Sequence, residues 1–256
     1  MKALIIATFG STHEDALRRD LDPVVRDLKT AVQVPVRVAF TSRMVIDRYE
    51  KKTGIRYENE VEAVEGFLVE GFLNEGFKAE EIFIQPLHIV EGIEYEKLVR
   101  LKSRGVAVGE ALFHEAVDLR RFVDDVGHRF EAPTVFVGHG SPTAADKDYD
   151  ELNRLFEEKN LPHRVCTIEG SVDDSLPLAY AKERGFHSVQ LAPLLLLAGD
   201  HAKNDIFGDD DSVKARFEAA GISVTPVAGG MGSWDFVRTI YVEKLRDYME
   251  KKPCEN

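Results

Sequence analysis

Short apolar runs alternate along the chain with longer segments in which apolar residues recur every three to four positions. The short runs predict β-strands, and the longer amphipathic segments predict helices. Alternation of strands and helices, with strands that are apolar throughout, predicts an α/β protein with parallel sheets covered on both faces. The strands are expected at 3–9, 36–41, 82–90, 134–138, 164–168, 188–197 and 223–227. The helices are expected at 12–31, 58–76, 95–104, 114–128, 144–158, 173–184, 211–220 and 234–250.

The two halves of the chain resemble each other. The segment 5–11 (Ile-Ile-Ala-Thr-Phe-Gly-Ser) matches 135–141 (Val-Phe-Val-Gly-His-Gly-Ser) at an offset of 130 residues. Two further matches follow in the same order: 35–38 with 162–165 at an offset of 127, and 86–92 with 193–199 at an offset of 107. Three ordered matches at strand ends predict a duplicated α/β domain. We therefore expect an N-terminal domain at 1–131 and a C-terminal domain at 132–256.

The repeat alignment identifies candidate metal ligands. The carboxyl ends of parallel strands face a common crevice, so side chains just beyond them can converge. The second half has two histidines and a glutamate at these positions, and this donor set suits zinc, cobalt, nickel or iron. A single loop histidine is ordinarily polar surface, and it is the equivalent placement of three such residues that favours a metal site. The alignment pairs Phe9 with His139, Ser42 with Glu169, and Glu94 with His201.

His139 has the most specific setting, because it lies between Gly138 and Gly140 immediately after an apolar strand. Glycines on both sides allow a tight turn and the close approach of a large ligand. Activation of Ser141 as a nucleophile is disfavoured, because the sequence lacks the Gly-x-Ser-x-Gly elbow. A dinucleotide fingerprint also fails, since the third glycine is absent. The loops beginning at Gly10 and Gly140 offer N–H groups that suit a carboxylate or a phosphate.

Other polar residues near the strand ends have two interpretations. Glu94 begins a helix, where a carboxylate commonly stabilises the dipole, but its pairing with His201 favours a role in the crevice. His88, expected inside a strand, fits a core histidine and a substrate-facing histidine equally well. Asp200 and Asp205 are candidates to orient the His201 ring. No role is assigned to the remaining histidines: His13, His114, His128, His163 and His187.

Composition excludes several classes of function. The 256-residue chain carries a net charge of −12, which argues against a nucleic-acid partner. Its two cysteines, Cys166 and Cys254, exclude a disulfide scaffold and an all-cysteine zinc cluster. No apolar run has the roughly 18–20 residues of a membrane span. The short apolar run at 3–9 continues directly into a charged segment, so we expect a first strand, no signal peptide, and a cytoplasmic protein.

Five motifs stand out in order along the chain, at 9–11, 39–42, 87–89 with 94–95, 138–140, and 198–202 with 204–205. Together they resemble the anaerobic cobalt chelatases of cobalamin biosynthesis, which are class II, ATP-independent enzymes. The resemblance covers essentially the whole chain and implies two similar flavodoxin-like domains with a tetrapyrrole cleft between them. It also implies that His139, Glu169 and His201 bind the metal and that Glu94 faces the cleft. One departure is the order Ser11-Thr12, which is reversed relative to the family pattern.

The activity implied by the resemblance is insertion of Co²⁺ into sirohydrochlorin or its oxidised form. Co²⁺ would be a substrate for which Ni²⁺, Fe²⁺ or Zn²⁺ can substitute, with no ATP and no organic cofactor. His139 and Glu94 are the expected catalytic residues, since an imidazole and a carboxylate can accept pyrrole protons. A negatively charged protein must compensate locally for a polyacidic substrate, for example with Arg43 and Lys203. The residues expected to bind the substrate are Phe9, Gly10, Ser11, Ser42 and His88.

Three alternatives stay open at this point. The first is an iron or nickel chelatase acting on a related tetrapyrrole, because this donor set does not separate the metals. The second is a non-catalytic carrier of a tetrapyrrole or a metal, which would not need Glu94 as a proton acceptor. A metal-dependent hydrolase is disfavoured, because neither a second carboxylate-rich site nor an elbow serine is found. A homo-oligomer is compatible with the sequence.

Overall fold

The structure, a computed structural model, describes residues 1–74 and 77–251. Residues 75 and 76, at the end of the expected helix 58–76, and Cys254 lie outside the described residues. The chain forms two compact units, Met1–Leu112 with Gly232–Asn256, and Phe113–Met231. Among the described residues, no helix combines the length and the apolar character needed to cross a bilayer.

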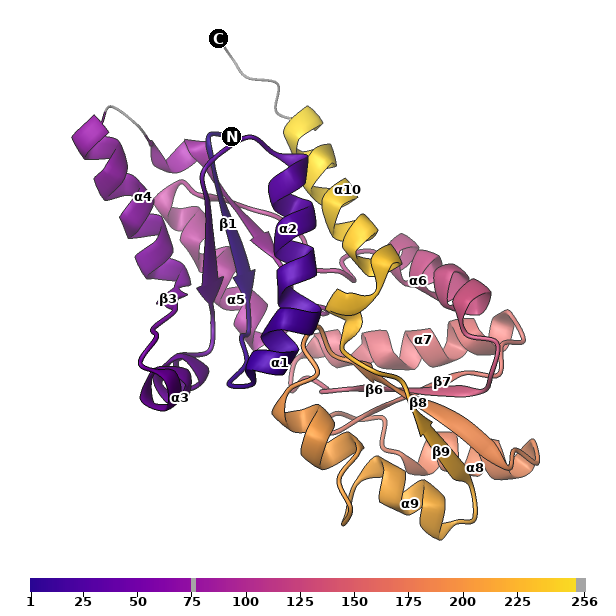
Figure 1. Ribbon diagram of the computed structural model, residues 1–256. Coiled ribbons are helices and arrows are strands. Elements are labelled where there is room, and N and C mark those ends of the chain that lie inside the picture. The colour runs from indigo at the N-terminus through magenta and orange to yellow at the C-terminus, as the bar shows by residue number, and fades with distance from the viewer. Residues whose placement is uncertain (75–76, 252–256) are drawn as a thin grey trace. The chain divides into compact units, whose positions relative to one another are not determined.

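The first unit, whose strand β1 and helices α2, α4 and α5 are labelled in Figure 1, contains a five-stranded parallel sheet in the order β3-β2-β1-β4-β5. Alternate residues of β1 face opposite sides of this sheet. On one side, Ile5 packs in a buried cluster with Phe67 of α4 and Leu98 of α5. The strands are β1 (Ala3–Thr8), β2 (Val36–Phe40), β3 (Glu58–Asn59), β4 (Ile82–Pro86) and β5 (Ala107–Val108). The helices are α1 (Glu14–Ala16), α2 (Asp22–Ala31), α3 (Arg43–Thr53), α4 (Glu60–Asn74), α5 (Ile93–Val99) and α10 (Asp235–Lys251).

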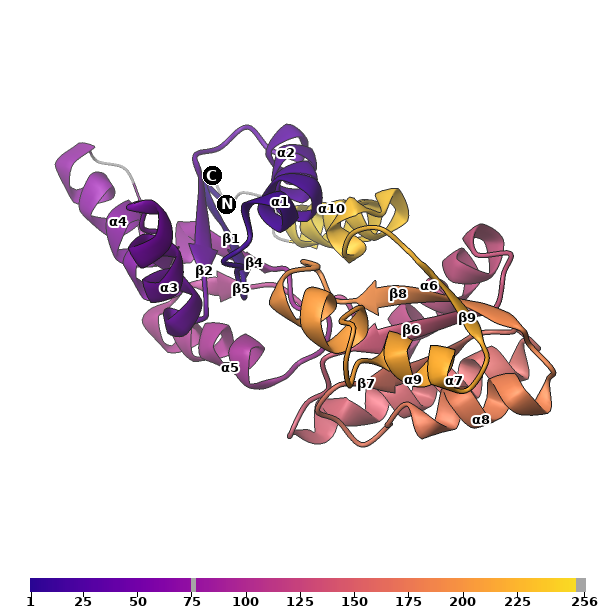
Figure 2. The same cartoon turned by 60° about the horizontal axis from the view of Figure 1, so that its bottom comes forward.

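The second unit contains a four-stranded parallel sheet in the order β7-β6-β8-β9 (Figure 2). On one side of β6, Val137 packs with Phe217 of α9, and on the other side Phe136 lies against Phe122 of α6 and Phe156 of α7. The strands are β6 (Thr134–Gly138), β7 (Arg164–Thr167), β8 (Ser188–Leu194) and β9 (Ser223–Pro226). The helices are α6 (Ala116–Arg129), α7 (Lys147–Glu158), α8 (Ser175–Glu183) and α9 (Val213–Ala219).

The two sheets share one topology. Without the two-residue edge strand β3, the order β2-β1-β4-β5 of the first sheet corresponds strand for strand to β7-β6-β8-β9 of the second. This order, in which the first strand lies between the second and the third, is that of flavodoxin-like sheets. The prediction of an α/β protein with two similar parallel sheets is therefore confirmed.

Each compact unit contains one helix that, in sequence, belongs to the other repeat. Helix α6 ends the first repeat but belongs to the second unit, and α10 ends the second repeat but belongs to the first unit. In α10, Arg238 donates to Asp27 of α2 at 2.7 Å, and the Tyr248 ring stacks on Phe83 of β4 at 3.8 Å between centroids. The expected division at 131/132 thus follows the repeat, whereas long-range packing sets the boundaries of the units at 112/113 and 231/232.

Several local elements differ from the predicted ones. Helix α3 is absent from the prediction, although Ser42 caps its start by accepting the Val45 N–H and Gly54 ends it in the left-handed region. The short strands β3 and β5 are also new. Strands β4 and β8 end at Pro86 and Leu194, before the expected ends at 90 and 197. His88 therefore follows a strand, and its expected place inside one was wrong.

The core histidine His163 gives a prediction about stability at acid pH. Its side chain is fully buried, and Nδ1 accepts the N–H of Thr134 at 3.3 Å, which a protonated ring could not do. Burial lowers the pKa of His163 from 6.5 to about 4. Below pH 6.5 the unfolded chain then binds more protons than the native protein. The contribution of His163 to the free energy of unfolding is therefore fully present above pH 6.5 and decreases as the pH falls toward 4. Between pH 7.5 and 5, the loss should be about 2 kcal/mol.

The measurement is the free energy of urea unfolding at these two pH values for the wild type and for His163→Gln. The variant should be less stable at pH 7.5 and should lose about 2 kcal/mol less on acidification. His187→Gln, which changes an exposed histidine of the same unit, is the control and should follow the wild type. An equal pH dependence in wild type and His163→Gln would contradict the interpretation.

Candidate functional site

The backbone places the first two aligned pairs of residues at equivalent positions. The N–H of Glu169 donates to the carbonyl of His139 at 2.8 Å, and the N–H of Ser42 donates to the carbonyl of Phe9 at 3.3 Å. The glycines that follow His139 and Phe9 have nearly the same positive φ, 92° and 93°. The duplication proposed from sequence therefore extends to individual hydrogen bonds beyond the strand ends.

The third pair is equivalent in the same way. The N–H of Gly92 donates to the carbonyl two residues before it at 2.9 Å, and that of Gly199 makes the same turn at 3.0 Å. Glu94 and His201 follow these glycines by two residues, each at the beginning of a helical segment. Both segments lie beyond the carboxyl ends of equivalent strands, β4 in the first sheet and β8 in the second.

In the second unit, His139 lies close to each of the other two candidate ligands, His201 and Glu169. The rings of His139 and His201 meet edge to face with their centroids 4.6 Å apart, and Nε2 of His139 lies 4.0 Å from Oε2 of Glu169. Two donors that each lie about 2.0–2.2 Å from one ion are at most about 4.4 Å apart, so the His139–Glu169 separation suits a shared ion. Throughout the described segments, 1–74 and 77–251, no group of three His, Cys, Asp or Glu side chains is arranged as it stands to hold a metal ion. The three side chains are between 38% and 66% exposed, which gives them room to adjust.

The ring of His201 is oriented by a carboxylate. Its Nδ1 lies 2.8 Å from Oδ2 of Asp205, one turn further along the π-helical segment Ala202–Ile206. A carboxylate partner on one ring nitrogen is common in metal-binding histidines, because it leaves the other nitrogen as the ligand. Nε2 of His201 is therefore the ligand atom expected here. The other candidate for orienting this ring, Asp200, accepts a hydrogen bond from Asn204 at 3.2 Å.

The loop that carries His139 requires glycine at position 140. A Cβ added to Gly140 would lie 2.3 Å from the backbone nitrogen of Gly170, next to Glu169, and the φ of +92° disfavours an L side chain. We expect Gly140→Ala to lower the free energy of unfolding by about 2–4 kcal/mol, since backbone strain and overpacking add. Separation of the two loops should also weaken cobalt binding.

Gly185→Ala is the matched control for Gly140→Ala. Gly185 has a φ of +68° but no heavy atom within 4 Å of an added Cβ, so this variant reports backbone strain alone. Its cost should be about 1–2 kcal/mol, and cobalt binding should be unchanged. Urea unfolding and cobalt titration of both variants are the measurements. Equal effects of the two substitutions on stability and on cobalt affinity would contradict the importance of the close approach.

The first unit presents a carboxylate with one unpartnered oxygen. Lys97 Nζ donates to Oε1 of Glu94 at 2.5 Å and contacts the carbonyl of Thr41 at 3.4 Å. Among the described residues, Oε2 of Glu94 is one of four buried side-chain oxygens and nitrogens without a hydrogen-bond partner. Such atoms are rare in native proteins, and a functional role is one of the accepted explanations. Lys97 was not identified from sequence, although its position three residues after Glu94 on a helix is the signal for this contact.

His88 lies near this pair in an apolar setting. Burial, with a smaller contribution from the positive charge of Lys97, lowers the pKa of His88 from 6.5 to about 4. The ring is therefore neutral near pH 7. Nε2 lies 3.5 Å from the hydroxyl of Thr41, and Nδ1 is a second of the four unpartnered buried atoms. A neutral ring with one unpartnered nitrogen can accept or donate a single hydrogen bond, but it supplies no charge for a substrate carboxylate.

The other residues expected to bind the substrate differ in accessibility. Phe9 is 42% exposed, whereas Ser11 and Ser42 are 6% and 5% exposed. Both hydroxyl oxygens accept local N–H groups, Ser11 in the turn after β1 and Ser42 at the start of α3. Gly10 is held against the Phe40 ring, which an added Cβ would approach to 2.4 Å. The two serines and Gly10 thus shape the loops, and Phe9 presents a surface to solvent.

Two exposed apolar side chains on neighbouring segments of this sheet were not identified from sequence. Met44, in α3 after β2, is 52% exposed, and Ile93, at the start of α5 after β4, is 49% exposed. Because β2, β1 and β4 are neighbours in the sheet, Phe9, Met44 and Ile93 all lie on segments that follow the carboxyl ends of adjacent strands. Exposed apolar side chains are a feature of many binding surfaces.

The cation expected from sequence in this region is already paired. Arg43 makes a two-pronged ion pair with Glu60, at 2.6 and 2.7 Å. The hydrogen bonds to Glu60, opposed by desolvation, raise the pKa of Arg43 above its ordinary value. Its charge is therefore largely neutralised within the protein, as is that of Lys97, which is paired with Glu94.

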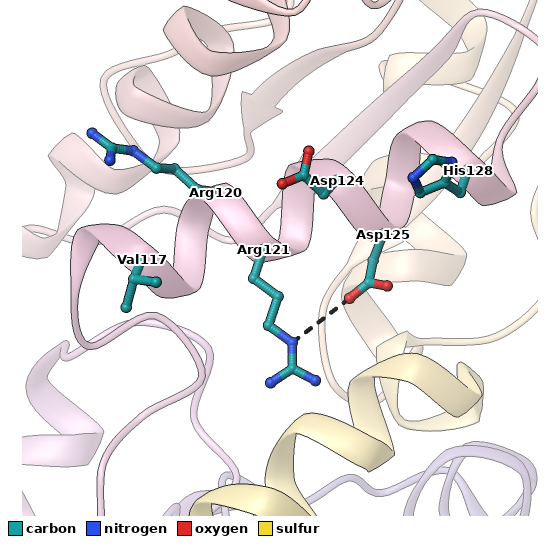
Figure 3. A pocket seen from close by; sticks show the side chains of 6 residues that line it. All are labelled: Val117, Arg120, Arg121, Asp124, Asp125 and His128. Carbon is teal, nitrogen blue, oxygen red and sulfur yellow. Dashed lines mark ion pairs between the residues drawn. The ribbon is translucent and has the colours of Figure 1, made fainter.

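Two other features are unsuited to this chemistry. Cys166 is fully buried, and burial raises the pKa of its thiol well above the ordinary value, so it does not supply a thiolate ligand. A shallow hollow of about 330 Å³ on α6 is lined by residues of that helix alone (Figure 3). One of its arginines, Arg121, pairs with Asp125 within the same helix at 3.9 Å. None of the candidate site residues contributes to this hollow.

Comparison with known proteins identifies the family to which the chain is similar. Residues 2–250 match the family described as Cobalt chelatase (CbiK). The sirohydrochlorin cobaltochelatase of Salmonella typhimurium is 32% identical over 260 residues, with 95% of each chain covered. The sirohydrochlorin cobaltochelatase CbiKC of Nitratidesulfovibrio vulgaris is 29% identical, with 95% of this chain and 89% of the relative covered.

A solved structure shares the fold. The sirohydrochlorin chelatase SirB of Bacillus subtilis subspecies spizizenii, determined in complex with cobalt, superposes with a TM-score of 0.61 at 15% identity. The match covers 98% of this chain and 97% of that protein. The family match extends over both sheets and over every candidate site residue described above. The chain belongs to the cobalt chelatase (CbiK) family.

Proposed function

We propose that the protein inserts Co²⁺ into sirohydrochlorin or its oxidised form without ATP. The observation that carries this proposal is the convergence of two imidazoles and one carboxylate beyond the strand ends of the second sheet. The names of the relatives in this family support cobalt as the metal and sirohydrochlorin as the acceptor.

The donor set suits a metal that must be bound and then released. His139, Glu169 and His201 supply three ligands, so coordination positions remain for water and for the incoming pyrrole nitrogens. A closed site of four protein ligands would retain the ion. The partial exposure of the three side chains leaves the bound Co²⁺ accessible to the macrocycle. As the ring nitrogens bind the ion, the protein ligands are replaced one at a time.

Metal insertion releases two pyrrole protons, which need acceptors. Oε2 of Glu94 is a suitable acceptor, because Lys97 holds the other oxygen and leaves this one without a partner. A carboxylate placed to take a proton in the transition state typically accelerates a reaction by ~10²–10⁴. His139 is the second candidate, since an imidazole that releases the metal is free to accept a proton. This use of Glu94 favours an enzyme over a carrier.

The first unit has features that suit a flat polyacid. Phe9, Met44 and Ile93 provide apolar contacts for the face of the macrocycle at the ends of β1, β2 and β4. An anionic substrate needs local compensation for the net charge of −12, but Arg43 and Lys97 are both paired with glutamates. The turn after β1 is the candidate to receive a substrate carboxylate, because in the turn after β6 the N–H groups of Ser141 and Thr143 are already accepted by Asp146 and Ser141.

The experiment is a spectrophotometric assay with purified protein, sirohydrochlorin and Co²⁺ in the absence of ATP. We expect metallation well above the rate without protein, and a slower reaction with Ni²⁺, Fe²⁺ or Zn²⁺, all of which this donor set can bind. A preference for Fe²⁺ or Ni²⁺ would replace cobalt in the proposal. Stoichiometric binding of sirohydrochlorin or Co²⁺ without any acceleration would favour the carrier and contradict the proposal.

A further inference from the structure

One buried carboxylate joins the two loops that carry His139 and Glu169. Oδ1 of Asp146 accepts the N–H of Ser141 at 2.9 Å, and Oδ2 accepts the N–H of Ser171 at 2.7 Å. Ser141 lies two residues after His139, and Ser171 lies two residues after Glu169. The direct backbone hydrogen bond between His139 and Glu169 is thus accompanied by a second link, which passes through Asp146.

Asp146 does not serve the helix that it precedes. An aspartate at the start of a helix ordinarily caps that helix by accepting one of its own N–H groups. Asp146 comes immediately before α7, but its backbone is already helical, with φ −63° and ψ −28°, and its side chain makes no capping bond. Its two oxygens are used instead between the two loops.

The surroundings of Asp146 leave little room for another arrangement. A Cβ added to Gly170 would lie 2.4 Å from Oδ1, so only glycine at position 170 permits this approach. Burial tends to raise the pKa of Asp146, but hydrogen bonds from Ser171 and Ser141 outweigh it and hold the pKa below its ordinary value. The ionised carboxylate accepts hydrogen bonds only, which matches the two N–H groups that face it.

The first repeat shows that the turn itself does not need this carboxylate. In both repeats a serine hydroxyl after the first strand accepts the N–H two residues further along, at 3.1 Å for Ser11 and 3.2 Å for Ser141. The offset of 130 residues places Ala16 opposite Asp146. The carboxylate is therefore an addition found in the repeat that carries the histidines, and stabilisation of the turn does not account for it.

We propose that Asp146 is a positioning residue that fixes the separation of His139 and Glu169 for cobalt binding. The inference rests on the proposed function of these two side chains as metal ligands. Asp146 does not touch the metal in this scheme, and its effect passes through the backbones of the two loops. Residues that hold metal ligands in place commonly change metal affinity or activity 10–100-fold when they are replaced.

The experiment is titration of the full-length protein with Co²⁺ at 25 °C, followed by the d–d absorption of the bound ion. Asp146→Asn keeps the size of the side chain but replaces one acceptor by a donor that faces an N–H group. We expect the Kd for Co²⁺ to rise ~10-fold and the absorption bands to change, because the ligands are no longer held together. Asp146→Ala, which removes both acceptors, should raise the Kd further. Asp150→Asn, at an exposed position on α7, is the control and should match the wild type.

Gly170→Ala tests the same contact from the other side. It keeps the carboxylate, but its added Cβ would crowd Oδ1 of Asp146 at 2.4 Å and the hydroxyl of Thr167 at 2.5 Å. It should therefore also raise the Kd for Co²⁺, and it provides a test if Asp146→Asn does not fold. A wild-type Kd and spectrum in folded Asp146→Asn or Gly170→Ala would overturn the inference, even if the melting temperature falls. Equal cobalt affinity of the wild type and His139→Ala would be a different result, because it would refute the metal site itself and the inference with it.

Discussion

His139→Ala is expected to abolish cobalt insertion while leaving the fold intact. The side chain is 41% exposed and follows β6 in a loop, so its truncation removes little buried surface. A change in the free energy of unfolding of less than about 1 kcal/mol is expected for such a position. The same truncation removes one of three metal ligands and one of two proton acceptors, so the rate of insertion should fall to that of the reaction without protein.

The measurement is single-turnover absorbance of the metallated product, together with cobalt titration and thermal melting. His187→Ala, at an exposed histidine of the same unit, controls for loss of an imidazole in general and should retain full activity. A wild-type rate in His139→Ala would place the chemistry elsewhere. A large loss of thermal stability would instead identify His139 as a structural residue.

The residue pairs of the site could be predicted from sequence because the chain contains its own alignment. The weak match of segments 5–11 and 135–141 placed Phe9 opposite His139, and the hydrogen bonds of their carbonyls show the same equivalence in three dimensions. The pairing of Glu94 with His201 was found although β4 and β8 end earlier than expected. The turns around Gly92 and Gly199 are alike, so the alignment of Glu94 with His201 is correct even though the ends of the two strands were predicted wrongly.

Features that depend on long-range packing could not be predicted in this way. The amphipathic pattern of α10 shows that one of its faces is buried, but it does not show which sheet that face covers. The ion pair of Arg238 with Asp27, 211 residues apart in sequence, places the helix in the first unit. Asp146 was missed for a similar reason: at the start of a helix it has the signature of a cap, whereas its partners lie in two separate loops.

Burial also changed the interpretation of individual side chains. Ser11 and Ser42 have the hydroxyls that suit a polar ligand, but in the structure their oxygens accept backbone N–H groups and they are almost completely buried. Arg43, selected from sequence for its charge, is neutralised by Glu60. Sequence shows which groups a loop contains, and the folded chain decides which of them are already satisfied.

Glu94→Gln is expected to slow cobalt insertion by ~10²–10⁴ while leaving the affinity for Co²⁺ unchanged. Glutamine keeps the size of the side chain, and its carbonyl can still accept the hydrogen bond of Lys97. The buried position of Oε2 then loses its basicity. Glu94 belongs to a different compact unit from His139, Glu169 and His201, and it is not one of the proposed ligands, so metal binding and proton transfer should separate in this variant.

Glu96→Gln is the matched control, since it makes the same change at an exposed position on α5. The measurements are cobalt titration and single-turnover insertion of the wild type and both variants. Equal rates in Glu94→Gln and Glu96→Gln would show that another group accepts the pyrrole protons. Weaker cobalt binding in Glu94→Gln would instead make Glu94 a metal ligand. Unchanged cobalt binding together with slow insertion is the result expected of an enzyme whose proton acceptor is separate from its metal ligands.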